Sequence, residues 1–283
     1  MNNKIAITVD STFDLSPELV ERFDIKAIIP LYVSLGEDSY KDGHGIDNAQ
    51  LEKYFNENKE LPKTSAATPY DFETEFRKLH DEGYDIVHFD IGDGFSSTYR
   101  NACIAAQQVG NVWVVNTKSL SSGVGMLASI ASDLAKAGKS AEEIFRICNE
   151  TTSKVDISFC IDTLTYLHKG GRCSGVARLG ANLLNLKPCI EVKDGGMVVG
   201  KKYRGNIEKI LPTYIKDRLE GKTNINTNRI LITHTMKDEK FVETLVDEIR
   251  KYQDFDEIYI TKAGSTIFTH CGANTLGIIF TTN

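Results

Sequence analysis

The chain has 283 residues, of which 41% are hydrophobic and 25% are charged, and its formal net charge is −6. This composition is that of an ordinary globular protein, and the length favours about two domains. The negative charge argues against nucleic acid as a partner and leaves room only for a transient contact with a membrane surface through a local basic patch. No apolar run approaches the roughly 20 residues of a membrane span, and the first residues lack a signal-peptide pattern, so we expect a cytoplasmic protein.

The first half of the chain alternates strands with helices. Apolar periodicity predicts strands at Lys4–Val9, Ile25–Val33 and Val112–Val115, and helices at Asn48–Asn58, Tyr70–His80, Met126–Lys136 and Ala141–Thr152. Polar, glycine- or hydroxyl-rich loops are expected at Gly36–Gly45 and Pro62–Pro69. Such alternation is typical of a mainly parallel sheet with helices on both faces, which binds ligands beyond the carboxyl ends of its strands.

The pattern changes near Thr152–Asp156, and we place a domain boundary there. The expected domains are residues 1–153 and 154–283, the second an α/β domain with a mixed or antiparallel sheet. In the second domain we predict strands at Ile157–Ile161, Ile230–Thr233 and Glu257–Thr261, and helices at Thr163–Lys169, Val176–Leu186 and Lys240–Tyr252. The turn Lys193–Gly196 between two apolar runs indicates a β-hairpin.

Two segments of the second half are harder to assign. Pro212 lies within Ile207–Leu219, so this segment is either two pieces or a helix that starts near the proline. The tail reads as a strand-like run through Ile267 and Phe268, followed by His270 and Gly272. A lone histidine is more often structural than functional, but a glycine beside it would let the backbone approach a ligand closely.

The stretch Tyr84–Val109 reads as a strand, a tight turn and a helix. The turn ends in Ser96, Ser97 and Thr98, beside the free backbone N–H groups at the start of the helix. An anion could bind there, although either serine could also simply cap the helix. The six cysteines are scattered without C-x-x-C pairs, so we expect reduced thiols and no metal or other cofactor.

Short motifs are spread over nearly the whole chain. They read Asp10-Ser11-Thr12-x-Asp14-Leu15, Thr64-Ser65-x-x-x-Pro69, Phe95-Ser96-Ser97-Thr98-Tyr99, Asp162-Thr163-Leu164-x-Tyr166-Leu167-x-Lys169-Gly170-Gly171-Arg172, Lys187-Pro188 and His270-x-Gly272-Ala273. In these motifs the chain resembles the DegV family. The resemblance implies a cytoplasmic, two-domain α/β protein that buries a long-chain fatty acid between its domains. It also implies that a separate fatty acid kinase receives the bound acid and makes an acyl phosphate.

The resemblance also implies which residues bind the fatty acid. Thr64, Ser96 and His270 match the family positions that hold the carboxylate, and His270 could donate a charge-assisted hydrogen bond to it. Ser65, Ser97 and Gly272 are secondary candidates beside them. The chain departs from the family pattern at Gly92, Asp93 and Ser97, where two serines and a glycine are usual, so that Asp93 could repel the head group.

Other interpretations stay open from the sequence. Ser96 as nucleophile and His270 as base would make a serine hydrolase acting on acyl esters, although no third residue stands out to orient the histidine. An interaction module is the least favoured alternative to a lipid carrier that has no turnover of its own. Four basic residues are predicted to form a patch near the pocket mouth that contacts the kinase or lipid head groups: Arg172, Lys201, Lys202 and Arg204.

Overall fold

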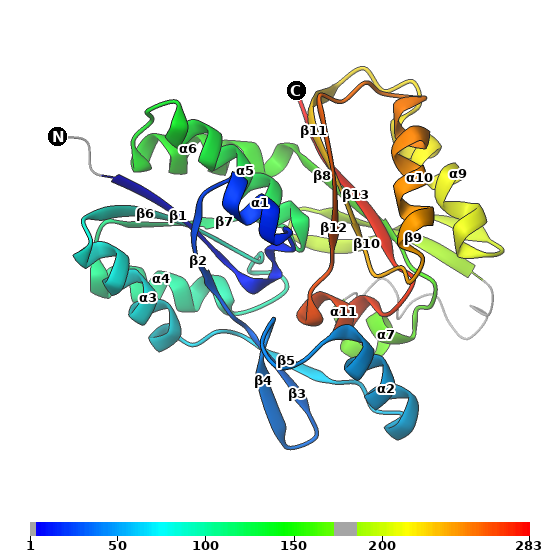
Figure 1. Cartoon of the computed structure of the whole chain (residues 1–283), viewed down its shortest axis with the longest axis horizontal. Helices are drawn as coiled ribbons and strands as arrows, with labels where there is room; N and C mark the ends of the chain where they lie inside the picture. The colour runs from blue at the N-terminus through cyan, green and yellow to red at the C-terminus, as the bar shows by residue number, and fades with distance from the viewer. Residues whose placement is uncertain (1–3, 173–185) are drawn as a thin grey trace.

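The structure of the chain is a computed structural model that describes residues 4–172 and 186–283. Two large sheets lie side by side, each with helices against it, and a small three-stranded sheet lies below them (Figure 1). The predicted helix Val176–Leu186 falls almost entirely outside the described residues. In the described part, the prediction of an α/β fold with two different sheets is confirmed.

The first large sheet is parallel throughout. Its strand order is β2 (Ile25–Ile29), β1 (Lys4–Asp10), β6 (Tyr84–Asp90) and β7 (Val112–Asn116). Alternate side chains of its strands enter two separate apolar clusters, so both faces are covered. One face carries α3 (Pro69–Asp81) and α4 (Thr98–Val109), and the other carries α1 (Pro17–Arg22), α5 (Ser122–Lys136) and α6 (Ala141–Thr151).

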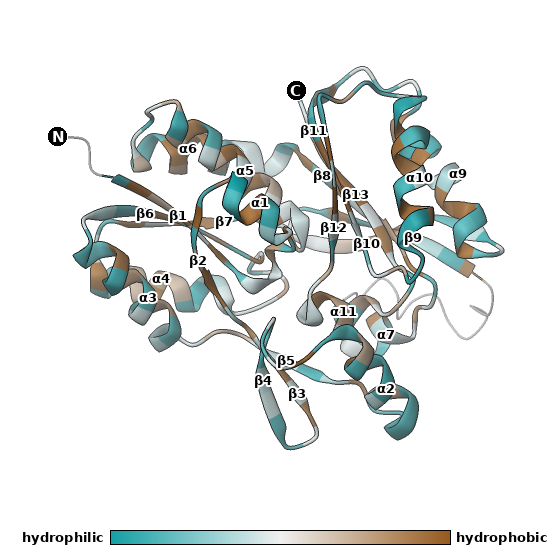
Figure 2. Ribbon diagram, viewed as in Figure 1, coloured by the Kyte–Doolittle hydropathy of each residue, from teal (hydrophilic) through white to brown (hydrophobic). Residues whose placement is uncertain are grey.

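The second large sheet is mixed. Its strand order is β10 (Gly196–Arg204), β9 (Leu186–Lys193), β8 (Val155–Cys160), β13 (Leu276–Thr282), β11 (Ile225–His234) and β12 (Glu257–Lys262). Only β11 and β12 run parallel among these neighbours, and β9 and β10 form the predicted hairpin. One face is covered by α9 (Ile207–Leu219) and α10 (Glu239–Arg250), which are hydrophobic toward the sheet and hydrophilic outside (Figure 2).

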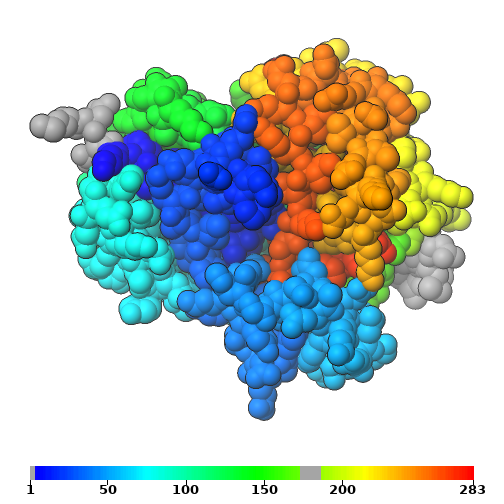
Figure 3. Space-filling view, viewed as in Figure 1, coloured from blue at the N-terminus to red at the C-terminus, as the bar shows by residue number. Residues whose placement is uncertain are grey.

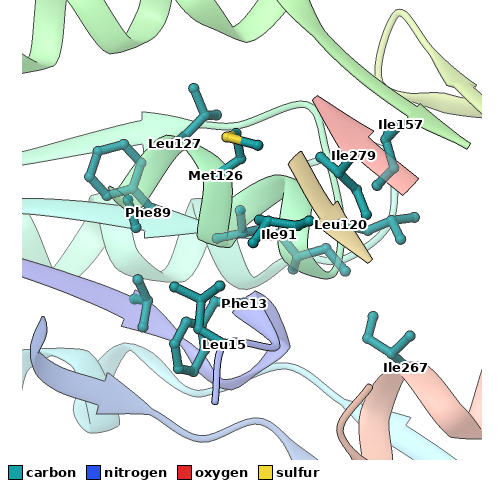
Figure 4. Packing of buried hydrophobic residues seen from close by; sticks show 14 of the residues in the cluster. Phe13, Leu15, Phe89, Ile91, Leu120, Met126, Leu127, Ile157, Ile267 and Ile279 are labelled. Atoms are coloured by element: carbon teal, nitrogen blue, oxygen red, sulfur yellow. The ribbon is translucent and has the colours of Figure 1, made fainter. Parts of the chain in front are cut away.

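The other face of this second sheet packs against the first half of the chain. Ile157, Phe159 and Ile279 share one apolar cluster with Leu120 and Met126, which follow strand β7. Figure 4 shows Ile157 and Ile279 beside Leu120. The chain passes from α6 to β8 near the boundary that we predict at Thr152–Asp156. The division of the chain into two domains at this point stays a prediction. We call the contact surface between the two large sheets the seam.

A small antiparallel sheet crosses the seam. It consists of β4 (Asp38–Lys41), β3 (Tyr32–Leu35) and β5 (Lys63–Ser65), and helix α2 (Asn48–Asn58) belongs to the same segment. The predictions of loops at Gly36–Gly45 and Pro62–Pro69 were therefore wrong in part. The strands are three or four residues long, which is too short to leave a periodic pattern in the sequence, and β5 pairs with β3 from a distant part of the chain. Figure 3 shows this segment beneath both halves of the molecule.

Helix α11 (Ser265–Cys271) and helix α7 (Thr165–Gly170) lie on the same side of the second half. The strand-like run before His270 is thus a helix, and the sequence prediction there was wrong. Seven residues, six of them buried, show no amphipathic period because the helix is covered on nearly all sides. Phe268 joins Val33 and Leu51 in a further apolar cluster, which fixes α11 against the small sheet.

Two further corrections concern proline and glycine. Helix α9 runs unbroken through Pro212, because its neighbours Leu211 and Tyr214 are fully buried and their packing outweighs the lost hydrogen bond. Helix α5 begins at Ser122 rather than Met126. A glycine in its first turn serves close packing, since a Cβ at Gly125 would lie 2.6 Å from the carbonyl oxygen of Phe13.

Candidate functional site

Thr64 and His270 meet at the seam although 206 residues separate them in the sequence. Thr64 lies on β5, paired with Val33 of β3, and His270 lies in the last turn of α11. The Oγ1 atom of Thr64 is 2.8 Å from Nε2 of His270, a hydrogen-bond distance. Two of the three predicted carboxylate-binding residues are therefore brought into direct contact by the fold.

Two buried aspartates from the first half hold the start of α11. Asp14 accepts hydrogen bonds from the backbone N–H of Gly264 at 2.8 Å and from the hydroxyl of Ser121 at 2.6 Å. Asp42 accepts hydrogen bonds from the backbone N–H groups of Ser265 and Thr266 at 3.1 and 3.4 Å. These N–H groups have no partner within the helix because they lie at its N-terminus. These contacts anchor the helix that carries His270 to the opposite half.

His270 is neutral at physiological pH in this structure. Burial, together with the charge of Arg172, lowers the pKa of His270 to about 4. Its Nδ1 atom is buried without a hydrogen-bond partner among the described residues and faces Gly170, where an added Cβ would lie only 2.7 Å away. The expected charge-assisted hydrogen bond therefore requires that a bound anion first raise this pKa.

A cavity of about 290 Å³ opens beside the Thr64 and His270 pair. Its wall is apolar away from the pair and includes Leu31, Ile91, Phe95, Leu120, Met197 and Ile267. Leu120 and Ile267 also border a smaller pocket of about 30 Å³ that lies between the two large sheets, next to Ile157 and Ile279. The labelled side chains of Leu120, Ile157 and Ile279 gather there in Figure 4. One polar end and an apolar interior are the features of a site for a long amphipathic ligand.

Ser96 lines the same cavity but does not bond to His270. Its Oγ atom lies 2.7 Å from Oγ1 of Thr98 and accepts from the N–H of Thr98, the first residue of α4, at 3.3 Å. The N-cap residue itself, Ser97, makes no side-chain cap bond. The carboxylate-binding role of Ser96 stays a prediction. The serine-hydrolase alternative lacks a supporting contact, because the hydroxyl that bonds to His270 belongs to Thr64.

The secondary candidates divide into lining and non-lining residues. Ser65 and Ser97 both line the cavity with exposed side chains. Gly272 does not line it; this glycine has a φ of 75° and touches the ring of Tyr166, where an added Cβ would lie 2.4 Å away. Its predicted contact with the ligand therefore has no geometric support. Asp93 is exposed and does not line the cavity. The expected repulsion between Asp93 and a head group therefore has no geometric support.

The predicted basic patch is not continuous. Arg172 lines the cavity, but Lys201, Lys202 and Arg204 lie along the edge strand β10, several residues beyond the cavity-lining Met197. At about 3.3 Å per residue, Arg204 is roughly 20 Å further along the strand. Lys201 is also paired with Asp217 at 2.6 Å. Only Arg172 therefore stands at the cavity.

Sequence reasoning missed Asp14, Asp42 and Gly170 as parts of the site. Asp14 and Gly170 lie inside the quoted motifs, so a signal existed, but nothing in the sequence linked them to His270.

Across residues 4–172 and 186–283, no three His, Cys, Asp or Glu side chains lie close enough together to hold a metal ion. No helix in those same ranges has the length and hydrophobicity to cross a membrane.

The model of one protein family, described as "Uncharacterised protein, DegV family", matches residues 4–283. The chain belongs to the DegV family. A DegV domain-containing protein of Clostridium acetobutylicum is 32% identical over 98% of each chain. A protein of Thermotoga maritima named fatty acid-binding protein is 30% identical over 97% of this DegV chain and 96% of its own. The structure of a DegV family protein from Thermus thermophilus, reported for its fatty acid binding, covers 100% of both chains with a TM-score of 0.88 at 29% identity.

Proposed function

We propose that this DegV protein binds a long-chain fatty acid in the seam cavity. The carboxylate is held by Thr64, Ser96 and His270, and the tail points past Leu120 and Ile267 into the space between the two large sheets. The observation that carries the proposal is the pair formed by Thr64 and His270, 2.8 Å apart at the polar end of an otherwise apolar cavity. The relatives whose names state fatty acid binding support the same ligand class.

The energetic roles of tail and head group differ. Burying about 15 methylene groups at about 0.8 kcal/mol each yields roughly 12 kcal/mol of gross transfer free energy, from which ordering and association costs are subtracted. The tail therefore provides the affinity. A carboxylate taken out of water without partners costs several kcal/mol, so the hydroxyls of Thr64 and Ser96 chiefly offset that cost and fix the direction of the acid.

The orientation suits a carrier that presents its ligand. Thr64 and His270 also border a second pocket, which is open to solvent, so the carboxylate end is the end of the seam cavity near solvent. We propose that a separate fatty acid kinase phosphorylates the carboxylate there, while the protein itself performs no turnover. In the ligand-free protein His270 is neutral and has a single N–H group. If this group is at Nε2 it donates to the oxygen of Thr64, and the Thr64 hydroxyl is then free to donate to the carboxylate.

The first test is native mass spectrometry of the purified protein, followed by denaturing extraction and identification of the released lipid. A stoichiometric fatty acid is the expected result.

Delipidated protein is then titrated with palmitate, and Thr64→Val is expected to weaken binding by about tenfold or more, since it leaves the buried carboxylate without one partner. Thr244→Val, an exposed site on α10, is the matched control. Protein that takes up no long-chain acid before or after delipidation would refute the proposal.

A further inference from the structure

A polar cavity of about 540 Å³ lies across the seam, at the end away from the Thr64 and His270 pair. We call it the back cavity. Its wall combines Lys118 and Ser119 of the first half with the start of β8, the tip of the hairpin β9–β10 and residues at the end of α9. Helix α7, which packs against α11, follows the opposite end of β8. The described walls of the back cavity and of the seam cavity share no residue, so the two are separate.

The back cavity has more cations than its own acids neutralise. Arg218 is ion-paired with Asp156 and, at 3.5 Å, with Glu191, while Lys193 lies 2.7 Å from Glu191. The other charged residues of the wall have no ion pair in the part of the chain that the structure describes; they are Lys118, Lys154, Lys222 and Asp194. Five cations against three acids leave an excess of two positive charges. Such an excess around a cavity favours an anion that is not part of the chain.

Two buried polar atoms of this wall point to the same kind of ligand. The Nε atom of Arg218 and the Oγ atom of Ser119 are buried without a hydrogen-bond partner among the described residues. Ser119 is only 2% exposed, and its hydroxyl lies against Gly123 in the first turn of α5, where the glycine leaves room for it. Buried polar atoms are normally hydrogen-bonded, and both of these can donate. Unused donors beside unpaired lysines are suited to a group that is rich in acceptor oxygens.

We infer that the back cavity binds the phosphate group of a small hydroxylated metabolite, a sugar phosphate. This inference does not depend on the proposed function. A phosphomonoester carries about −1.5 to −2 charges at pH 7 and has three strong acceptor oxygens, which matches the excess of two charges and the unused donors. Asp194 would repel the phosphate itself but can accept hydrogen bonds from sugar hydroxyls.

The composition of the wall disfavours other anions. Its apolar members are Val155, Ile157 and Val192, and no aromatic side chain belongs to the described wall. An acyl chain would therefore find little apolar surface there, and a nucleotide base would have no ring to stack on. A polar ligand that carries both a phosphate and hydroxyl groups fits this wall better.

The test uses calorimetry with three probes at low salt: ribose 5-phosphate, inorganic phosphate and ribose. Ribose 5-phosphate should bind at a single site, at least about threefold more tightly than inorganic phosphate, because only the ester also offers hydroxyls. Ribose alone should not bind, and added salt should weaken the binding of the ester. Because this ligand contacts both halves of the folded chain, the unfolding temperature should rise with its concentration.

The first variant combines Lys118→Asn, Lys154→Gln and Lys222→Gln; asparagine is chosen because residue 118 has a φ of 49°. It should bind ribose 5-phosphate about tenfold or more weakly. The matched control replaces three exposed lysines away from the back cavity by Gln, at Lys78, Lys209 and Lys240, and should bind like the wild type.

The second variant is Ser119→Ala, which also serves if the triple variant does not fold. It should weaken the binding of ribose 5-phosphate by about threefold or more, since one buried donor is lost. Its stability in urea should not fall, because the hydroxyl has no partner to lose within the described chain. A serine with a purely structural role would show the reverse, a loss of stability with unchanged binding.

Three results would overturn the inference. Wild-type protein could fail to bind ribose 5-phosphate, inorganic phosphate could bind as tightly as the ester, or the back-cavity variants could bind like the lysine control. The second result would assign the cavity to free phosphate instead. Failure to bind palmitate would refute the proposed function and leave this inference standing, so the two failures can be told apart.

Discussion

Helices on the two faces of the six-stranded sheet are held in different ways. On one face, α9 and α10 are held by an apolar cluster drawn entirely from the second half of the chain. On the seam side, α11 is held at its start by Asp14 and Asp42 of the first half, and at its end His270 bonds to Thr64, also of the first half. Apolar packing holds the helices of the outer face, whereas on the seam side directional hydrogen bonds add to the apolar contacts of Ile267 and Phe268 and position the binding site.

Removing packing on the apolar face should have the largest effect on stability. Leu211 is fully buried in the cluster under α9. Leu211→Ala should lower the free energy of unfolding by about 2–5 kcal/mol, through lost transfer energy and the cavity left behind. Palmitate affinity of the folded protein should stay within about threefold, because no contact of α11 is lost. Urea denaturation and fatty acid titration measure the two effects, and a parallel loss of affinity would contradict the comparison.

Removing a seam carboxylate should have a smaller effect on stability and a larger one on binding. Asp42→Ala leaves the buried N–H groups of Ser265 and Thr266 without their acceptor, at a cost of about 1–3 kcal/mol. Because the start of α11 is then free to shift, palmitate affinity should fall by about tenfold or more. Asp254→Ala, an exposed acid, is the control and should change neither quantity. Unchanged affinity in Asp42→Ala would show that the aspartates do not position His270.

Binding should take up a proton at His270. Burial and the nearby charge of Arg172 lower the pKa of the free protein's His270 to about 4, and a bound carboxylate would raise it by attracting the imidazolium. Binding therefore takes up protons between pH 4 and the raised pKa, and affinity falls as pH increases through that range. Calorimetry at pH 6 in two buffers of different ionisation enthalpy should give different binding enthalpies for the wild type.

The matched variant for this prediction is His270→Gln, which can still bond to Thr64 but cannot titrate near neutral pH. Its binding enthalpy should be the same in both buffers. In the ligand-free wild type, the depressed pKa of His270 should also cost stability as pH falls from 6.5 toward about 4, a cost that the variant lacks. Equal enthalpies for the wild type in both buffers would mean that His270 stays neutral with the acid bound.

Charge reversal far along the edge strand should have the smallest effect on the protein itself. Arg204→Glu changes an exposed side chain about seven residues beyond Met197 on β10, so palmitate affinity and stability should both stay unchanged. If the predicted contact with a kinase is right, coupled phosphorylation of the bound acid should nevertheless fall. An Arg204→Glu protein that supports phosphorylation at the wild-type rate would remove this residue from the predicted contact.

Local patterns predicted most of the regular structure. The strands Lys4–Asp10 and Val112–Asn116 and the helix Asn48–Asn58 follow from periodicity within one residue of their ends, and the helix Glu239–Arg250 within two. Most of the errors have a common cause. The short strand near Thr64, the helix around Phe268 and the helix through Pro212 depend on partners far away in the sequence, and no local pattern records such contacts. The strand near Ser39 pairs locally with the strand at Ser34, but it is too short to show a period.

The sequence by itself determined the fold class, the family motifs and the residue types of the site, because strand and helix periodicity and turn chemistry act over a few residues. It could not show that Thr64 would bond to His270, that Asp14 and Asp42 would hold α11, or that Lys201, Lys202 and Arg204 would lie away from the cavity. These depend on how two sheets pack across the seam. Burial at the seam also made His270 neutral, since a pKa depends on the surroundings that only the tertiary structure creates.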